Sequence, residues 1–390
     1  MPLTRRENLM ALLAHQQAEH VSAVFVVDNF NRPHPLPLGL EGEDPLDPRI
    51  QRYLGGDVID RLAVSEQVVR SFRTVVLGSQ TLPDGRVLQT WETPLGALYR
   101  RAVPSGEAQT TFTVEFPVKR AEDYDRLCLI LRDAEIKADV AAIQREGRAH
   151  LARTGEDGIT YSVGPSTPIM ELTRSWTGLE RFVYDLQDQP ERVALALKLM
   201  HQINCRHYEL LCASMLGRVV VNWDDVNNLY LSRRLLQEYW VPTIRDYAAI
   251  CHRYGKLFVM HTCGRLQGFI DLFAETGLDA IDWLTPPPTG DVTFAEAQGI
   301  LGAGVAVMGA AEPGAMRFGS PDAVEQSLHG WLAGVDLKRN FCLLIPCPLG
   351  TPLANAARVA RVLERDYGLE LNREPGFPAI WEDPHTQQAG

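Results

Sequence analysis

Short apolar runs alternate with helical stretches along most of this 390-residue chain, and this alternation limits the possible folds more than any other feature. Such runs, bounded by polar or turn residues, are typical of buried strands. Strands that alternate with helices form a parallel sheet, and repeats in this number favour a closed (β/α)8 barrel over an open sheet. The expected strands are residues 24–27, 159–163, 219–222, 256–260, 280–283, 305–308 and 341–345, and the expected helices are residues 190–215, 232–254, 268–276, 321–334 and 354–367.

The eighth strand of such a barrel is expected in the weakly patterned residues 57–63. Residues 64–120 then break the rhythm of strand and helix. Within them, the stretch 81–87 contains a Pro-Asp-Gly signal of the kind that joins antiparallel strands. We interpret residues 64–120 as a β-meander inserted near the barrel mouth, and covering it, in a single barrel domain that spans residues 1–390.

Charge and composition narrow the possible functions. The formal net charge is -11 and the basic residues form no cluster beyond short pairs, which argues against a nucleic-acid partner. The longest apolar runs are too short for a membrane span or for the apolar segment of a signal peptide. Seven cysteines without the spacing of a disulfide framework are typical of a reducing compartment. We therefore expect a cytoplasmic protein that binds small molecules or protein partners.

The motif His261-Thr262-Cys263 directly follows the expected strand 256–260, and the alternation of a strand directs the His and Cys side chains to the same side. A lone His or Cys beside a strand is more often a core residue than a ligand. A catalytic zinc usually has three protein ligands and an open position. Because the loops after barrel strands meet at one mouth, Cys347 at the end of strand 341–345 is the natural third ligand.

Carboxylates follow other expected strands. Asp224 and Asp225 come after strand 219–222, and Glu312 lies a few residues beyond strand 305–308. The aspartate pair either caps the next helix or acts at the mouth, where paired carboxylates bind metals or transfer protons. We consider all three residues as catalytic candidates, of which Glu312 is the weakest.

Aromatic side chains close to strand ends either pack against loops or form the walls of a substrate pocket. Packing is the more common of the two roles. The candidates for substrate binding are Asn29, Tyr161, Trp176, Trp223 and Trp283.

Several motifs in combination resemble one protein family. They are His261-Thr262-Cys263-Gly264, Asp224-Asp225, Tyr254-Gly255-Lys256, Gly277-Leu278-Asp279 and the closing segment from Cys347 to Asn355. Together they resemble the uroporphyrinogen decarboxylase superfamily, and more closely its zinc-dependent, corrinoid-linked methyltransferase branch. The resemblance spans nearly the whole chain. It implies that His261, Cys263 and Cys347 hold a zinc ion and that the barrel fold is that of the superfamily.

The chain also departs from the decarboxylases of this superfamily. They carry an Arg-rich amino-terminal loop that binds a tetrapyrrole, and residues 27–34 of this chain lack it. They also have His where this chain has Cys347. Porphyrinogen decarboxylation is therefore disfavoured. Because the chain shows no Asp-x-His-x-x-Gly pattern of a corrinoid-binding domain, cobalamin is expected to come on a separate corrinoid protein.

Two directions of methyl transfer stay open. In one, zinc polarises the oxygen of a methyl ether while the cobalamin of the partner takes the methyl group. In the other, a thiol such as coenzyme M or homocysteine attacks a methylcorrinoid. We favour the first, because the chain is longer than the compact thiol-methylating relatives and its aromatic residues suit a methoxylated aromatic ring. The remaining alternatives for the activity are a uroporphyrinogen-type decarboxylase and a non-catalytic zinc-binding barrel. For the assembly, we consider a homodimer.

Overall fold

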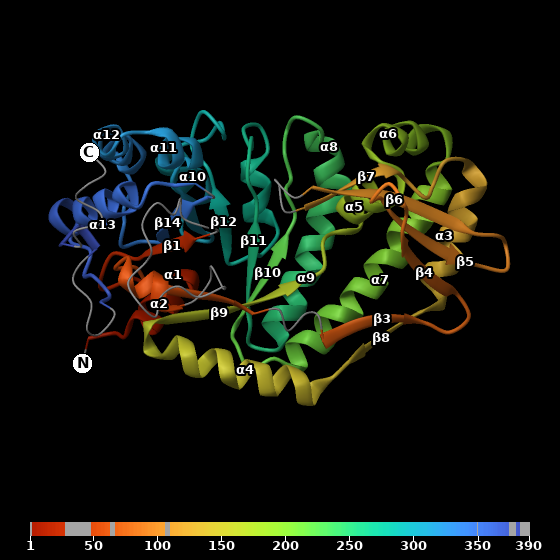
Figure 1. Cartoon of the computed structure of the whole chain (residues 1–390), viewed down its shortest axis with the longest axis horizontal. Coiled ribbons are helices and arrows are strands. Elements are labelled where there is room, and N and C mark those ends of the chain that lie inside the picture. The colour runs from red at the N-terminus through yellow and green to blue at the C-terminus, as the bar shows by residue number, and fades with distance from the viewer. Residues whose placement is uncertain are drawn as a thin grey trace.

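Eight parallel strands form one sheet in the order β1-β14-β13-β12-β11-β10-β9-β2 in this computed structural model (Figure 1). The structure describes residues 2–27, 48–62, 67–105, 110–348, 350–373 and 380–382. The predicted (β/α)8 barrel is confirmed, including its eighth strand. The strands are β1 (Ala23–Val27), β2 (Val58–Leu62), β9 (Gly158–Gly164), β10 (Val219–Trp223), β11 (Leu257–His261), β12 (Ala280–Leu284), β13 (Ala306–Ala310) and β14 (Phe341–Cys347).

The barrel closes between β1 and β2, which stand at the two ends of the strand order. The Asp57 N–H donates to the Ala23 carbonyl oxygen over 2.7 Å. A Cβ atom at Gly56 would lie only 2.9 Å from that oxygen and from the Phe25 ring. Only glycine therefore allows the two edges to approach this closely.

Helices surround the barrel, and two predicted helices differ from expectation. Residues 232–254 divide into α8, the π-helical turn η4 and α9, because Pro242 lacks the N–H that a continuous helix requires. Residues 268–276 form the 3-10 turn η5. The helices are α1 (Arg5–Leu13), α2 (Pro48–Tyr53), α3 (Ala121–Asp133), α4 (Val140–Thr154), α5 (Pro168–Glu171), α6 (Leu179–Asp188), α7 (Pro190–Ser214), α8 (Arg233–Leu235), α9 (Val241–Arg253), α10 (Phe294–Leu301), α11 (Pro313–Phe318), α12 (Pro321–Leu332) and α13 (Leu353–Tyr367), and the short turns are η2 (Gly155–Asp157), η3 (Leu172–Thr177), η4 (Leu236–Trp240), η5 (Ile270–Glu275) and η6 (Ile380–Glu382). None of the described helices is long and apolar enough to cross a membrane.

The apolar side chains form two cores, which follow from the alternation of the strands. One core lies inside the barrel and includes Val24, Val221, Val259 and Leu344, and α1 adds Leu12 to it. The other core lies between the strands and the helices. Both faces of each barrel strand are thus buried, which explains why these strands are apolar runs in the sequence.

An insertion between β2 and β9 carries a four-stranded antiparallel meander, as predicted. It lies to one side of the barrel (Figure 1), and α3, which follows it in the chain, contacts both β6 and α7. Trp91 of the meander packs against Trp176 of η3, with ring centroids 4.9 Å apart, so the insertion contacts the segment that follows β9. The inserted strands are β3 (Val68–Phe72), β4 (Val76–Thr81), β5 (Val87–Glu92), β6 (Leu98–Ser105), β7 (Thr110–Glu115) and β8 (Ala134–Ala138), of which β3 and β8 pair with each other.

Candidate active site

Three side chains that could hold a metal ion meet at the carboxyl ends of β10 and β11. The ligand atoms of Asp225, His261 and Cys263 all lie within 4.8 Å of one another. The Cys263 thiol donates to Asp225 Oδ1 over 3.4 Å, and His261 Nε2 lies 3.6 Å from the same oxygen. We call these three residues the mouth group. Nitrogen, sulfur and oxygen donors in one cluster fit zinc.

The backbone after Cys263 requires glycine. Gly264 has a φ of +97°, which L side chains rarely adopt. A Cβ atom at this position would also lie 2.3 Å from the Asn227 amide nitrogen. The turn at Gly264 therefore ends the motif sharply and keeps Cys263 at the mouth beside His261.

A buried carboxylate orients the His261 ring. Asp282 of β12 lies opposite His261 in the strand register, and its Oδ2 is 3.3 Å from His261 Nδ1. The Asp282 side chain is almost fully buried. A carboxylate that accepts from one ring nitrogen is the usual partner of a metal-binding histidine, and it leaves Nε2 free for the ion. Asp282 was not among the residues predicted from the sequence, although an acidic residue inside an apolar strand was a signal for it.

Arg174 pairs with the mouth group. Arg174 of η3 donates through Nη2 to Asp225 Oδ2 over 2.7 Å, which leaves Oδ1 turned to His261 and Cys263. With Asp225 and Asp282 on one side and Arg174 on the other, carboxylates outnumber cations. This local charge favours a bound cation. Arg174 was not predicted from the sequence either.

The Cys263 thiol is strongly affected by its surroundings. Burial, together with the negative charge of Asp225, raises the pKa of this thiol to about 12. Without a nearby cation the side chain is therefore protonated at neutral pH. A metal ion that binds here has to displace this proton, and the attraction of a dication for the thiolate reverses the direction of the pKa shift.

The two neighbouring aspartates have different partners. Asp224 is fully buried and both its oxygens accept from the Thr167 N–H, at 3.0 and 3.2 Å. Burial raises the pKa of Asp224 to about 6. Asp224 thus anchors the loop that begins α5, whereas Asp225 belongs to the mouth group.

Cys347 is the last residue of β14 and is fully buried. Two strands, β12 and β13, lie between β14 and β11 in the sheet. Among the described residues that meet within 4.8 Å, the mouth group does not include Cys347. The predicted ligand set of His261, Cys263 and Cys347 stays a prediction.

Two of the predicted aromatic residues flank His261. The ring centroids of Trp223 and Trp283 lie 6.4 and 5.7 Å from that of His261. Trp283 has a φ of +73°, and the pairing of β12 with β13 shifts register between Asp282 and Leu284. A bulge of this kind re-aims a side chain, and strain of this kind is often found at functional sites.

The other described candidates have contacts with residues outside the mouth group. Tyr161 lies inside the barrel, where its hydroxyl donates to the Met308 sulfur. Trp176 is buried against Trp91. Glu312 caps α11 by accepting from the Ala315 N–H over 2.6 Å. Asn29 lies outside the described residues.

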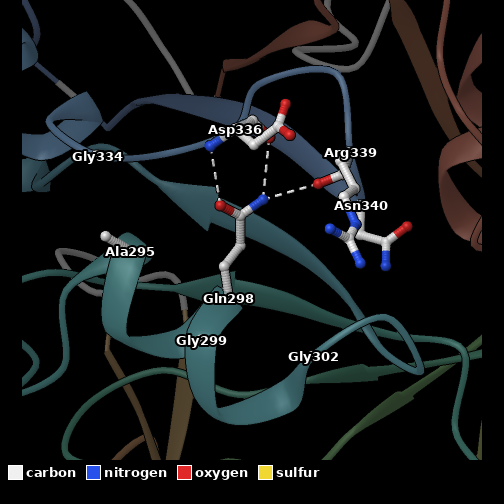
Figure 2. A pocket seen from close by; sticks show the side chains of 8 residues that line it. All are labelled: Ala295, Gln298, Gly299, Gly302, Gly334, Asp336, Arg339 and Asn340. Atoms are coloured by element: carbon white, nitrogen blue, oxygen red, sulfur yellow. Dashed lines mark hydrogen bonds between the residues drawn. The ribbon is translucent and has the colours of Figure 1, made fainter.

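A cavity of about 310 Å³ lies at the opposite end of the barrel, where β13 and β14 begin (Figure 2). The Gln298 amide bonds the backbone of Asp336 and the carbonyl of Arg339, and so fastens the loop before β14. Barrel enzymes place their chemistry at the carboxyl ends of the strands, and the amino ends serve stability. The position of this cavity therefore separates it from the mouth group.

The chain is similar to known proteins in sequence pattern and in fold. The family model described as uroporphyrinogen decarboxylase (URO-D) matches residues 116–365, more than half of the chain. No curated protein sequence matches the chain. The structure of a methyltransferase from Methanosarcina mazei superposes with a TM-score of 0.59 at 12% identity, covering 94% of this chain and 99% of that one. A D-psicose 3-epimerase from Clostridium cellulolyticum H10 has a TM-score of 0.30 at 10% identity, covering 52% of this chain and 69% of that one.

Proposed function

Because the chain belongs to the uroporphyrinogen decarboxylase family, we propose that it uses this fold for zinc-dependent methyl transfer. It takes the methyl group of a methyl ether, such as a methoxylated aromatic compound, and passes it to the cobalamin of a separate corrinoid protein. The observation that carries the proposal is the mouth group of Asp225, His261 and Cys263 at the barrel mouth. The fold shared with a methyltransferase from Methanosarcina mazei supports it.

The proposed zinc ligands come from the carboxyl ends of β11 and β14. His261 and Cys263 supply two of them, and the resemblance to the methyltransferase branch supplies Cys347 as the third. Asp225 is the fourth donor in reach of the pair. Imidazole and thiolate donors favour zinc, so His261, Cys263 and Cys347 would hold the ion and the Asp225 carboxylate would be its weakest donor. When bound, zinc supplies a Lewis acid that stabilises negative charge on a leaving oxygen.

Other side chains hold the proposed zinc ligands in place. Asp282 fixes the His261 ring through Nδ1, and Arg174 holds the outer oxygen of Asp225. The rings of Trp223 and Trp283 flank His261 and offer apolar faces on which a flat aromatic substrate can pack. Asp224 acts as a positioning residue, since it holds the loop that begins α5.

The reaction balances without a further reagent. The C–O bond of the ether breaks and its electron pair stays on the oxygen, which takes a proton from water. The methyl carbon forms a new bond to cobalt, and cob(I)alamin supplies that electron pair. No oxidant or reductant is consumed beyond the cobalamin.

The test is incubation of the zinc-loaded protein with cob(I)alamin and a panel of methoxyarenes, quaternary amines and thioethers. We expect the absorption spectrum of methylcobalamin to develop with methoxyarenes only. Cys263→Ser should abolish this change. If no compound yields methylcobalamin while a thiol is methylated from added methylcobalamin, the direction of transfer is the reverse of the one proposed.

A further inference from the structure

Asp291 lies in the loop that follows β12, and its carboxylate bonds the loops that follow β10 and β11. Its Oδ1 accepts from the backbone N–H groups of Leu266 and Gln267, over 2.7 and 2.9 Å. Its Oδ2 accepts from the Asn228 amide over 3.0 Å. Leu266 and Gln267 belong to the loop after β11, and Asn228 belongs to the loop after β10. We call these four residues the loop clamp.

The two loops that the clamp joins carry the mouth group. Asp225 lies shortly before Asn228 in the chain, and Cys263 lies shortly before Leu266. Residues 224–227 and 262–266 belong to no helix or strand. The bonds that fix these stretches therefore come largely from outside regular secondary structure, and the position of the mouth group depends on them.

Direct hydrogen bonds also join the two loops, and they connect neutral groups. The Asn228 N–H donates to the Arg265 carbonyl oxygen over 2.9 Å. The Thr262 hydroxyl donates to the Val226 carbonyl oxygen over 3.3 Å. A hydrogen bond to a carboxylate is roughly twice as strong as a bond between neutral groups. Of the bonds named, those of Asp291 therefore fix the two loops most strongly.

We propose that Asp291 is a positioning residue, which holds Asp225 and Cys263 at the barrel mouth before a metal ion binds. Loops that are already fixed lose little conformational freedom on binding, and a preorganised site therefore has a higher affinity. The effect on zinc rests on the proposed function. The effect on the loops of the metal-free protein does not rest on it.

The first test is the zinc affinity of Asp291→Asn, which keeps the size of the carboxylate and removes its charge. The new amide has one acceptor oxygen and one donor nitrogen. Whichever way it turns, its donor faces either the two backbone N–H groups or the Asn228 amide. We expect the affinity for zinc, measured by competition with a chromogenic chelator, to fall at least about tenfold. An unchanged affinity overturns the proposal.

Asp133→Asn is the matched control, because Asp133 anchors a loop of the insertion in the same way. Its Oδ2 accepts from the backbone N–H groups of Thr74 and Val75, each over 2.8 Å. The anchored loop joins β3 to β4 and carries no residue of the mouth group. Asp133→Asn should lower the melting temperature and leave the zinc affinity unchanged. An equal loss of affinity in both variants is general destabilisation and overturns the proposal.

Cobalt(II) in place of zinc reports on the positions of the ligands, because its absorption bands depend on the coordination geometry. We expect these bands to differ between Asp291→Asn and the unmodified protein, and to be the same in Asp133→Asn and the unmodified protein. A purely structural role of Asp291 would lower the melting temperature without changing the cobalt spectrum. That result overturns the proposal as well.

The metal-free protein tests the loops independently of zinc. Iodoacetamide should alkylate Cys263 at least about threefold faster in Asp291→Asn than in the unmodified protein, since a loosened loop opens more often. Mass spectrometry of the digested protein measures this rate, with the half-buried Cys205 of α7 as the internal reference. The rate in Asp133→Asn should stay unchanged. An unchanged rate in Asp291→Asn overturns the proposal.

Two outcomes separate the loop clamp from the proposed function. Faster alkylation of Cys263 in Asp291→Asn, with no zinc bound by the unmodified protein, supports the clamp and overturns zinc-dependent methyl transfer. Methyl transfer by the zinc-loaded protein, with unchanged zinc affinity and alkylation in Asp291→Asn, supports the proposed function and overturns the clamp. Should Asp291→Asn not fold, as judged by circular dichroism, Asn228→Ala decides by the same two measurements. Lower affinity and faster alkylation then support the clamp, and unchanged values overturn it.

Discussion

Two groups of side chains bring a histidine close to carboxylates, one at the barrel mouth and one between α12 and α13, and they differ in charge. In the second, which we call the outer group, ligand atoms of Glu325, His329 and Asp366 lie within 4.8 Å of one another. Arg358 and Arg365 each approach Glu325 to 2.7 Å, and Arg365 also pairs with Asp366. The carboxylates of the outer group are therefore already neutralised.

The mouth group has fewer cations and a softer donor. Among the arginines that the structure describes, Arg174 alone is paired with the carboxylate of Asp225, while Asp282 is turned to His261. The mouth group also contains the thiol of Cys263, and the outer group has no sulfur donor. Because zinc favours imidazole and thiolate, donor type and remaining negative charge both select the mouth group.

The difference shows that closeness of ligand atoms is a weak criterion for a metal site. An arginine that already pairs with a carboxylate removes most of the attraction that a cation would meet. The outer group is an ion-pair network on helices, and the mouth group is a set of donors on adjoining strand ends. Variants in the mouth group should therefore lower the zinc content, whereas variants in the outer group should leave it unchanged.

The largest expected effect is the loss of zinc in Cys263→Ser. We expect about one zinc per chain in the unmodified protein, from a site with three protein ligands and an open position. Removal of the thiolate should lower the content after dialysis below about one tenth, measured by inductively coupled plasma mass spectrometry. His329→Ala is the matched control and should keep its zinc. Zinc lost in His329→Ala and kept in Cys263→Ser would reverse the comparison.

Cys347→Ser tests the ligand that the structure does not bring into the mouth group. We expect it to lose most of its zinc, because the resemblance implies a thiolate ligand from the end of β14. Cys342→Ser, on the same strand, is the control, since Cys342 belongs to the core inside the barrel. It should keep full zinc content. If Cys347→Ser also keeps its zinc, Asp225 is the third protein ligand.

The local pattern of the sequence was enough to predict most of the fold. Barrel strands are buried on both faces and thus leave continuous apolar runs. The weak pattern near β2 has a physical cause, because Asp60 lies within this strand and is buried. Arg153 of α4 bonds both its oxygens at 2.6 Å, and His150 approaches one of them to 2.9 Å. Only the folded chain supplies these partners.

The candidate site was predicted in part. His261 and Cys263 are close in sequence, so alternation alone places them together. Asp224 and Asp225 are neighbours too, yet one anchors a loop and the other joins the mouth group. Arg174 enters from another segment of the chain, and such a contact depends on how the loops pack rather than on local spacing.

Asp282→Asn should weaken zinc binding without abolishing it. The amide is a poorer acceptor for His261 Nδ1–H, and loss of such a partner typically lowers metal affinity about tenfold to hundredfold. Competition with a chromogenic chelator measures this change. Asp279→Asn, just before the same strand, is the control, since Asp279 pairs with His252 away from the mouth group. Equal zinc affinity in the Asp282→Asn variant and the unmodified protein would remove Asp282 from the site.

The smallest effect is expected in the outer group, where Glu325→Gln should leave the zinc content unchanged and lower the melting temperature by no more than about 2 °C. Hydrogen bonds from Arg365 and Arg358 lower the pKa of Glu325 below its ordinary value of 4.5. A lowered pKa means that the ionised carboxylate stabilises the folded state above pH 4.5, and that this contribution is lost as the pH falls through the folded-state value. Thermal melts of both proteins between pH 7 and pH 3 should therefore converge on the acid side. A difference that grows as the pH falls would show that Glu325 is not held by its arginines, and the charge contrast between the two groups would then no longer explain their behaviour.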